Sequence, residues 1–379
     1  MVTADTRWLL AALRKRSNMN EKLLKREERA VFALRELYSA HGYSYYKMSK
    51  FEEYDLYVEN KDFLVSDGII SFTDGGKLMA LKPDVTLSII KGVNRGESKK
   101  LYYNENVYRR SKETGAFKEL MQVGLECVGE VTAFDQIEVI SLAVDSLKLL
   151  GGSYALDLSH LALIEAAFDS LGLSSQQRER ATDYIASKNL HDLKNMLVGF
   201  GEEAARGLIG LLACSGPLPE AVEKLSLLNL SGKASEAVSE LKLISECLTA
   251  MGKIEGVNLD FSVTSSTGYY SGTVFKGFIL GSSQSVLSGG CYDRLMKKTH
   301  GDGKAIGFAV YLDLIGSGYD KIAPETQVAL IGKGVDALTL VKFAAQLRER
   351  YASVEVVDRI QAKYDKVYRI ENGGLIEND

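Results

Sequence analysis

The chain has 379 residues, of which 46% are apolar, enough for two or three domains with their own cores. Its 46 basic and 50 acidic residues give a net charge of −4, which argues against nucleic-acid binding, because such proteins carry a basic surplus. The apolar run of residues 8–13 is too short to cross a bilayer, and no cleavage site follows it, so we expect a cytoplasmic protein. The four cysteines lack paired spacing, which predicts reduced thiols and no metal site.

An amphipathic helix is predicted from about residue 19 to 41, because Val31 and Leu34 belong to an apolar stripe at helical spacing that Gly42 ends. Residues 43–58 predict a strand that leads into a loop. Two short strands then flank the turn sequence Thr73-Asp74-Gly75-Gly76-Lys77, which predicts a hairpin.

The sequence Lys82-Pro83-Asp84-Val85-Thr86 follows this hairpin and leads into a short predicted helix, residues 87–93. Pro83 takes the chain out of the strand, because proline has no backbone N–H to donate. Asp84 and Thr86 have two interpretations. They cap the helix, as Asp and Thr commonly do, or they bind the ammonium group of a ligand.

A long antiparallel hairpin is predicted over residues 101–129, where two β-prone runs flank a polar loop. Side chains alternate between the faces of a strand, so Arg109 shares a face with Tyr103, and Gln122 shares one with Glu126. Such a polar face is either exposed to solvent or the floor of a pocket for a small charged molecule. In the second case Arg109 binds a carboxylate and Glu126 a cationic or N–H group.

A helix over residues 131–150 and a strand over 155–158 complete an α+β pattern on an antiparallel sheet. Residues 160–251 are rich in Ala, Leu, Glu and Lys and contain no convincing strand, so we predict an insertion of three to five helices. His160 and His191 lie in or beside it and are interpreted as satisfied structural histidines, not as metal ligands.

Strands return at residues 258–264, and glycines are dense from there to residue 313. Glycine weakens a strand unless a ligand or another backbone approaches closely, so these glycines indicate either a crowded site or simple turns. Tyr270 and Tyr292 lie in this region. Each offers a hydroxyl and a ring face that suit an imidazole or another flat polar group, or each is a core tyrosine.

Together these motifs resemble the catalytic domain of histidyl-tRNA synthetase, a class II aminoacyl-tRNA synthetase, over roughly residues 20–314. The matching motifs are Lys-Pro-Asp-x-Thr, Gln-Val-Gly-x-Glu in the long hairpin, and Tyr-Tyr-x-Gly-Thr-Val-Phe with Gly-Gly-x-Tyr-Asp. The resemblance implies a class II synthetase-like antiparallel sheet flanked by helices, and a pocket for histidine. The implied histidine-binding residues are Asp84 and Thr86 at the α-amino group, Arg109 and Gln122 at the carboxylate, and Glu126, Tyr270 and Tyr292 around the imidazole, with Tyr269 beside them.

Three positions depart from the synthetase pattern, each where that family carries a charge that handles ATP. Ser265 and Leu314 stand in place of arginines, and Ser111 in place of the adenine-binding glutamate. Without its arginines, a phosphoryl-bearing transition state would form on the order of a thousand-fold more slowly. This pattern resembles the regulatory subunits of ATP phosphoribosyltransferase, which are paralogues of the synthetase. The resemblance implies no catalytic residue and no cofactor in this chain.

That family implies a subunit that binds histidine as an effector and controls the first step of histidine biosynthesis. It assembles with the short catalytic subunit, as a homodimer within a hetero-octamer, and has no nucleic-acid or membrane partner. The alternative is histidyl-tRNA synthetase itself. The expected organisation is a synthetase-like domain of residues 1–159 and 252–323, the helical insertion 160–251, and a C-terminal α/β segment, 324–379, with one βαβ unit and a polar end.

Overall fold

The computed structural model describes residues 24–60, 68–110, 114–151, 153–264, 270–282, 284–315, 327–351, 353–360, 364–371 and 373–378. The apolar run 8–13, Ser111, Ser265 and Tyr269 lie outside these ranges. The chain forms two compact units, one of residues 30–317 and one of residues 1–29 with 318–379. Among the helices that the structure describes, none has the length and apolar character needed to cross a bilayer.

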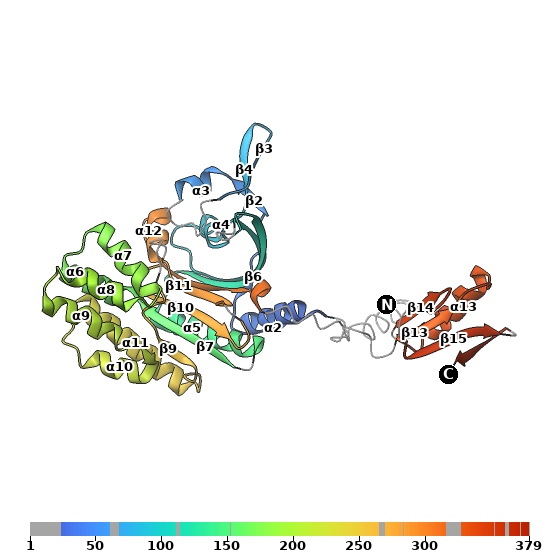
Figure 1. Cartoon of the computed structure of the whole chain (residues 1–379). Coiled ribbons are helices and arrows are strands. Elements are labelled where there is room, and N and C mark those ends of the chain that lie inside the picture. The colour runs from blue at the N-terminus through green and yellow to red at the C-terminus, as the bar shows by residue number, and fades with distance from the viewer. Residues whose placement is uncertain are drawn as a thin grey trace, which may run out of the picture. The chain divides into compact units, whose positions relative to one another are not determined.

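A nine-stranded sheet forms the centre of the larger unit, in the order β1-β5-β6-β12-β11-β10-β7-β9-β8 (Figure 1). Its strands are β1 (Ser44–Tyr45), β5 (Lys99–Arg110), β6 (Phe117–Gly129), β7 (Tyr154–His160), β8 (Gly216–Pro217), β9 (Val257–Leu259), β10 (Thr273–Ile279), β11 (Leu287–Cys291) and β12 (Lys304–Tyr311). Neighbouring strands are antiparallel, except that β1 pairs with β5 and β7 with β9 in parallel. The predicted α+β fold on a largely antiparallel sheet is confirmed.

Helices flank this sheet. Those outside the helical insertion are α2 (Arg26–Ala40), α3 (Asp55–Glu59), α4 (Thr86–Lys91), α5 (Ala133–Leu150), α12 (Asp293–His300) and the short 3-10 helix η3 (Leu312–Leu314). A capping box between Thr132 and Asp135 begins α5, whose buried residues join the main core. All four cysteines are described and are free thiols, and Cys127 and Cys214 are buried.

Alternation along β6 sorts the two faces of the sheet. Val123 and Leu125 belong to the same buried cluster as the apolar residues of α5, and burying each such side chain contributes roughly 1.5–3 kcal/mol. Gln122 and Glu126 point to the opposite face. The strands beside β6 continue this opposite face with small residues, which are Ala309, Gly307, Ser288 and Gly290. The face is therefore polar and leaves room for a cavity.

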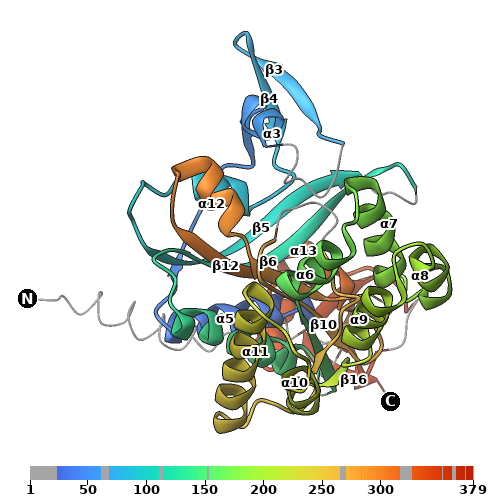
Figure 2. The same cartoon turned by 90° about the vertical axis from the view of Figure 1, so that its left-hand side faces the viewer.

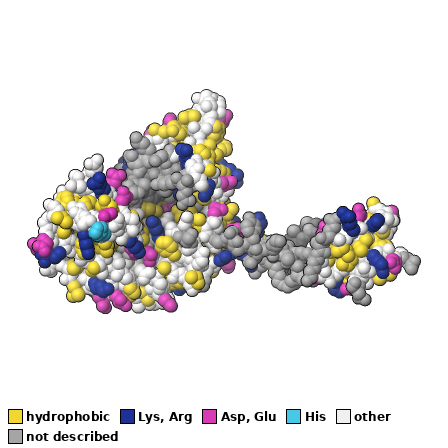
Figure 3. Space-filling model, viewed as in Figure 1, with side chains coloured by type: hydrophobic (Ala, Val, Ile, Leu, Met, Phe, Trp, Pro, Cys, Tyr) yellow, Lys and Arg dark blue, Asp and Glu magenta, His cyan; other side chains and the backbone are white. Residues whose placement is uncertain are grey.

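A second sheet, β2-β4-β3, extends from this unit and comprises β2 (Phe51–Glu53), β3 (Ser71–Asp74) and β4 (Lys77–Leu81). The predicted hairpin between β3 and β4 is confirmed, and its turn uses positive φ at Gly75 and Gly76. The prediction for residues 43–58 is wrong in detail, because the segment forms two short strands and α3. Figure 3 shows hydrophobic side chains over this part of the molecule, and the exposed rings of Phe51 and Phe72 pack edge to face on this sheet.

Six helices lie between β7 and β9, so the predicted three to five are too few (Figure 2). They are α6 (Leu161–Leu171), α7 (Ser175–Ala186), α8 (Leu190–Leu197), α9 (Glu202–Leu212), α10 (Leu218–Ser226) and α11 (Lys233–Ala250). Short loops with polar caps at Ser174 and Asn189 separate helices that composition alone does not divide. The prediction of no strand here also misses β8, a two-residue strand that pairs with β9. His191 in α8 is exposed.

The C-terminal unit contains a four-stranded sheet of order β14-β13-β15-β16. Its elements are β13 (Gln327–Ile331), α13 (Ala337–Arg348), β14 (Ser353–Val357), β15 (Lys366–Glu371) and β16 (Gly374–Asn378). The predicted βαβ unit is confirmed by the parallel pairing of β13 with β14. The predicted polar end is wrong, because it forms β15 and β16, and Tyr368 and Ile370 pack into this unit's core despite their polar neighbours.

Candidate binding pocket

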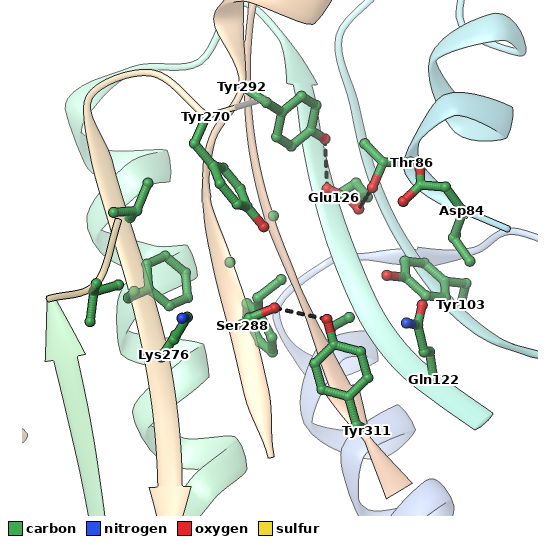
Figure 4. A pocket seen from close by; sticks show the side chains of 18 of the residues that line it. Asp84, Thr86, Tyr103, Gln122, Glu126, Tyr270, Lys276, Ser288, Tyr292 and Tyr311 are labelled. Atoms are coloured by element: carbon green, nitrogen blue, oxygen red, sulfur yellow. Dashed lines mark hydrogen bonds between the residues drawn. The ribbon is translucent and has the colours of Figure 1, made fainter. Parts of the chain in front are cut away.

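A cavity of about 220 Å³ lies on the polar face of the central sheet (Figure 4). The start of α4, the β5–β6 hairpin and strands β10 to β12 line it. Of the sequence-predicted site residues, those in the cavity wall are Asp84, Thr86, Arg109, Gln122, Glu126, Tyr270 and Tyr292. Gln122 and Glu126 are each 2% exposed, so the hairpin face is a pocket floor and not a solvated surface. Tyr269 lies outside the described residues.

Glu126 is held by hydrogen bonds from two other parts of the chain. The Thr86 hydroxyl donates to Oε1 across 2.8 Å, and the Tyr292 hydroxyl donates to Oε2 across 2.6 Å. Burial raises the pKa of Glu126 to about 8, although both hydrogen bonds act to lower it. A cationic or N–H group that enters the pocket would therefore meet a carboxyl group that readily exchanges its proton near neutral pH.

Asp84 both contacts the start of α4 and lines the cavity. Its Oδ1 accepts the backbone N–H of Leu87 across 3.0 Å, as a helix-capping carboxylate does. Its Oδ2 lies 3.6 Å from Nη2 of Arg109, whose Nε donates to the Pro83 carbonyl across 2.8 Å. Burial raises the pKa of Asp84, and Arg109 opposes that shift. Asp84 thus places a negative charge in the cavity wall while it holds the start of α4.

Gln122 supplies a hydrogen-bond donor that the described protein atoms leave unused. Its Nε2 is buried and has no hydrogen-bond partner in the part of the chain that the structure describes. An unpaired buried amide costs about 1–3 kcal/mol, so a ligand acceptor in the cavity would be favoured.

Lys276, Ser288 and Tyr311 are among the lining residues that the sequence analysis did not assign to the site. Lys276 on β10 pairs across the ladder with Ser288 on β11, and the Ser288 hydroxyl lies 2.8 Å from the Tyr311 hydroxyl on β12 (Figure 4). The alternation of Val274 and Lys276 with buried Phe275 was a usable signal that these side chains share the pocket face.

A separate polar cluster lies where the helical insertion meets the sheet. His160 is buried, and its Nε2 is 3.5 Å from Glu240 on α11. Glu240 also accepts hydrogen bonds from Thr273, at 2.7 Å, and from Gln136, which lies near Cys291. The interpretation of His160 as a satisfied histidine needs correction, since neither ring nitrogen makes a hydrogen bond to the described residues. Its contact in this cluster is instead the 3.5 Å approach of Nε2 to the Glu240 carboxylate.

Comparisons with known proteins agree with this fold. A protein from Clostridium kluyveri named ATP phosphoribosyltransferase regulatory subunit is 27% identical over 291 residues, which are 74% of this chain and 74% of that protein. A solved Bacillus halodurans structure described as an ATP phosphoribosyltransferase regulatory subunit/histidyl-tRNA synthetase is 23% identical, has a TM-score of 0.73, and covers 89% of this chain and 90% of its own. A chain of the ATP phosphoribosyl transferase (HisG:HisZ) complex from Thermotoga maritima is 20% identical, with a TM-score of 0.60 and coverage of 76% and 97%.

The antiparallel sheet, its flanking helices and the pocket on its polar face define a class II aminoacyl-tRNA synthetase-like domain. The family described as histidyl-tRNA synthetase matches residues 17–315. The chain belongs to this family, and its relatives include the proteins named ATP phosphoribosyltransferase regulatory subunit.

Proposed function

We propose that this chain is a non-catalytic regulatory subunit of ATP phosphoribosyltransferase. In this role it binds histidine in the cavity and controls the first step of histidine biosynthesis through the short catalytic subunit. The names of its relatives support the regulatory role, and the description of the Thermotoga maritima complex supports a catalytic partner. The homodimer within a hetero-octamer belongs to the same proposal. We also propose that the chain is organised into three parts: the synthetase-like domain, the helical insertion and the C-terminal segment.

The observation that carries the histidine assignment is the buried Glu126 carboxyl group beside Tyr292 and Thr86. A carboxyl group and a phenol suit the two ring nitrogens of an imidazole, because these nitrogens donate or accept according to their protonation. We assign Tyr270 to the imidazole side of the cavity, and the role of Tyr269, which lies outside the described residues, stays a prediction.

The backbone groups of histidine require the opposite charges. Asp84, with the Thr86 hydroxyl, suits the α-ammonium group, since a carboxylate pairs with a cation. We assign Arg109 and Gln122, whose Nε2 has no partner among the described residues, to the carboxylate side. The cavity thus offers a complementary group for each polar part of the amino acid.

A regulatory role also fits the apolar character of the position after β12. Leu314 packs against the main core as part of η3, so this position offers no cation for a phosphate.

In the regulatory role, binding of histidine would be coupled to the partner's active site, with a coupling free energy of typically about 1–3 kcal/mol. Histidyl-tRNA synthetase remains the second candidate, because the matched family carries that description.

Two measurements on the purified full chain separate these candidates. Calorimetric titration with histidine tests the pocket, and ATP:pyrophosphate exchange on the same sample tests adenylation. We expect binding without exchange, together with copurification of the short phosphoribosyltransferase when the two chains are coexpressed. ATP:pyrophosphate exchange activity would instead support the function of a histidyl-tRNA synthetase. Absence of histidine binding, both alone and with the catalytic subunit, would refute the effector role.

A further inference from the structure

The cavity has carboxyl groups at one end and an ammonium group at the other. Asp84 and Glu126 lie beside the start of α4, whereas Lys276 enters the cavity from β10 on the other side (Figure 4). The strand register gives the width of the cavity between these ends. Lys276 on β10 lies in one row across the sheet with Ser288 on β11, Ala309 on β12 and Gly124 on β6. Three strand spacings separate Lys276 from Gly124, so their backbones are about 14 Å apart. Side chains that reach inward from both ends leave a gap that suits a small zwitterion.

The ammonium group of Lys276 has no carboxylate within ion-pair distance among the described residues. Its cross-strand neighbour on β7 is Asp157, but that carboxylate accepts a hydrogen bond from Asn258 across 3.0 Å. A half-buried cation without a counter-ion favours an anionic ligand group, because the attraction is strengthened where water is partly excluded. Lys276 therefore brings an available positive charge to the cavity.

Arg109 is differently placed. Its Nε already donates to the Pro83 carbonyl, and its charge is offset by Asp84 at 3.6 Å. Ser288 lies directly beside Lys276 in the ladder, and among the described residues its hydroxyl is hydrogen-bonded to the Tyr311 hydroxyl, which also interacts with Arg109. One hydroxyl of this pair donates to the other, so the second proton is free to reach a ligand oxygen.

We propose that Lys276 is the principal cation for the ligand's carboxylate, with the Ser288–Tyr311 hydroxyl pair beside it, and that Arg109 mainly positions Asp84. This inference rests on the proposed function, because it names the group that binds the carboxylate of histidine in the same cavity. Lys276 then also sets specificity, since a ligand that keeps the imidazole and amine but lacks the carboxylate leaves its charge unpaired.

The test compares two ligands on two matched variants. Lys276→Met removes the charge and keeps an unbranched stem, and Lys304→Met changes an exposed lysine on β12 outside the cavity wall. Each full-length chain is titrated calorimetrically with histidine and with histamine, which has no carboxylate. We expect Lys276→Met to weaken histidine binding about 10- to 100-fold. Histamine binding should change by less than about threefold. Lys276→Arg should recover most of the histidine affinity.

The outcomes separate this inference from the proposed function. Equal losses for histidine and histamine, or an unchanged histidine affinity in Lys276→Met, would overturn the role of Lys276 while histidine binding by the parent chain still stood. No histidine binding by the parent chain, alone or with its catalytic subunit, would overturn both. Thermal midpoints check the fold of each variant, and Lys276→Gln replaces the Met variant if that one does not fold.

Discussion

The Tyr292 hydroxyl donates to Glu126 Oε2 across 2.6 Å, although the two residues are 166 positions apart in the chain. Thr86 donates to the other oxygen of the same carboxyl group. Three distant segments therefore meet at one buried group, which retains acceptor capacity for a ligand, because each carboxylate oxygen has two acceptor sites. This contact makes the protonation of Glu126 central to what the cavity binds.

We expect histidine affinity to be highest between about pH 6.5 and pH 8. Glu126 has a pKa of about 8 because of its burial, and a free imidazole has a pKa of about 6.5. Between these values Glu126 and the ligand together carry one proton, as their complex does. Below this window binding must release a proton, and above it binding must take one up, so affinity falls on both sides.

Calorimetry in buffers of different ionisation enthalpy measures this proton exchange directly. Protonation of Asp84, whose pKa burial also raises, would add to the loss at acid pH. Glu126→Gln should lose the decline above pH 8, because an amide does not titrate there. An affinity that stays flat from about pH 5.5 to pH 9 in the parent chain would contradict the assignment of Glu126.

Gly307→Ala should weaken histidine binding, because the added methyl group on β12 displaces the Glu126 carboxylate. A Cβ at position 307 would overlap the Glu126 carboxylate, so we expect histidine affinity to fall at least about tenfold and the free energy of unfolding by about 1–3 kcal/mol. Gly207→Ala in α9 is the matched control. Nothing lies near its added methyl group, and the change should raise the free energy of unfolding by about 0.5–1 kcal/mol. Normal histidine binding by Gly307→Ala would show that Glu126 is not required where we place it.

Asp84→Asn should separate the two roles of this residue. The amide oxygen can still accept the Leu87 N–H and hold the start of α4, so the only stability lost should be that of the Arg109 contact, while histidine affinity falls about 10- to 100-fold with the loss of charge. Asp84→Ala should lose both, with a further cost of about 1 kcal/mol for the cap. Titration and urea denaturation measure the two effects. Unchanged histidine affinity in either variant would refute the assignment of Asp84 to the ammonium group.

Glu240→Gln should reduce stability near neutral pH and matter less in acid. Burial acts to raise the pKa of Glu240, but His160 and the hydrogen bonds from Thr273 and Gln136 outweigh it and hold the pKa at about 2. A lowered carboxylate pKa stabilises the fold above its usual value of 4.5, and this contribution is lost as pH falls towards 2. Glu240 is about one-third exposed, so we expect a difference of about 1 kcal/mol at pH 6.

Urea denaturation of Glu240→Gln and the parent chain between pH 2.5 and pH 6 measures this difference. The two stability curves should converge as the solution becomes acidic. A constant difference across the range would mean that the contacts of Glu240 stabilise the fold independently of its charge.

The sequence by itself determined the elements whose reasons are local. The β5–β6 hairpin and the turn at Gly75 and Gly76 were predictable, because alternation and turn chemistry act between residues that are close in the chain. Asp84 and Glu126 were predictable as site candidates because their motifs resemble those of the synthetase family, whereas their local pattern alone left a helix cap and a solvated strand face open. Their use in histidine binding stays a prediction.

Tertiary structure alone decided which side chains share the cavity and which contacts they make. Lys276 faces Ser288 and Tyr311 only because β10, β11 and β12 pair in one register, and His160 meets Glu240 only because α11 returns to the sheet. The strands β15 and β16 likewise form from sequence that is polar by composition, once Tyr368 finds its core. The local sequence pattern determines the backbone conformation of a residue and the face of the sheet on which its side chain lies. The contacts that give the site its chemistry join distant segments, so they form only when the whole sheet has assembled.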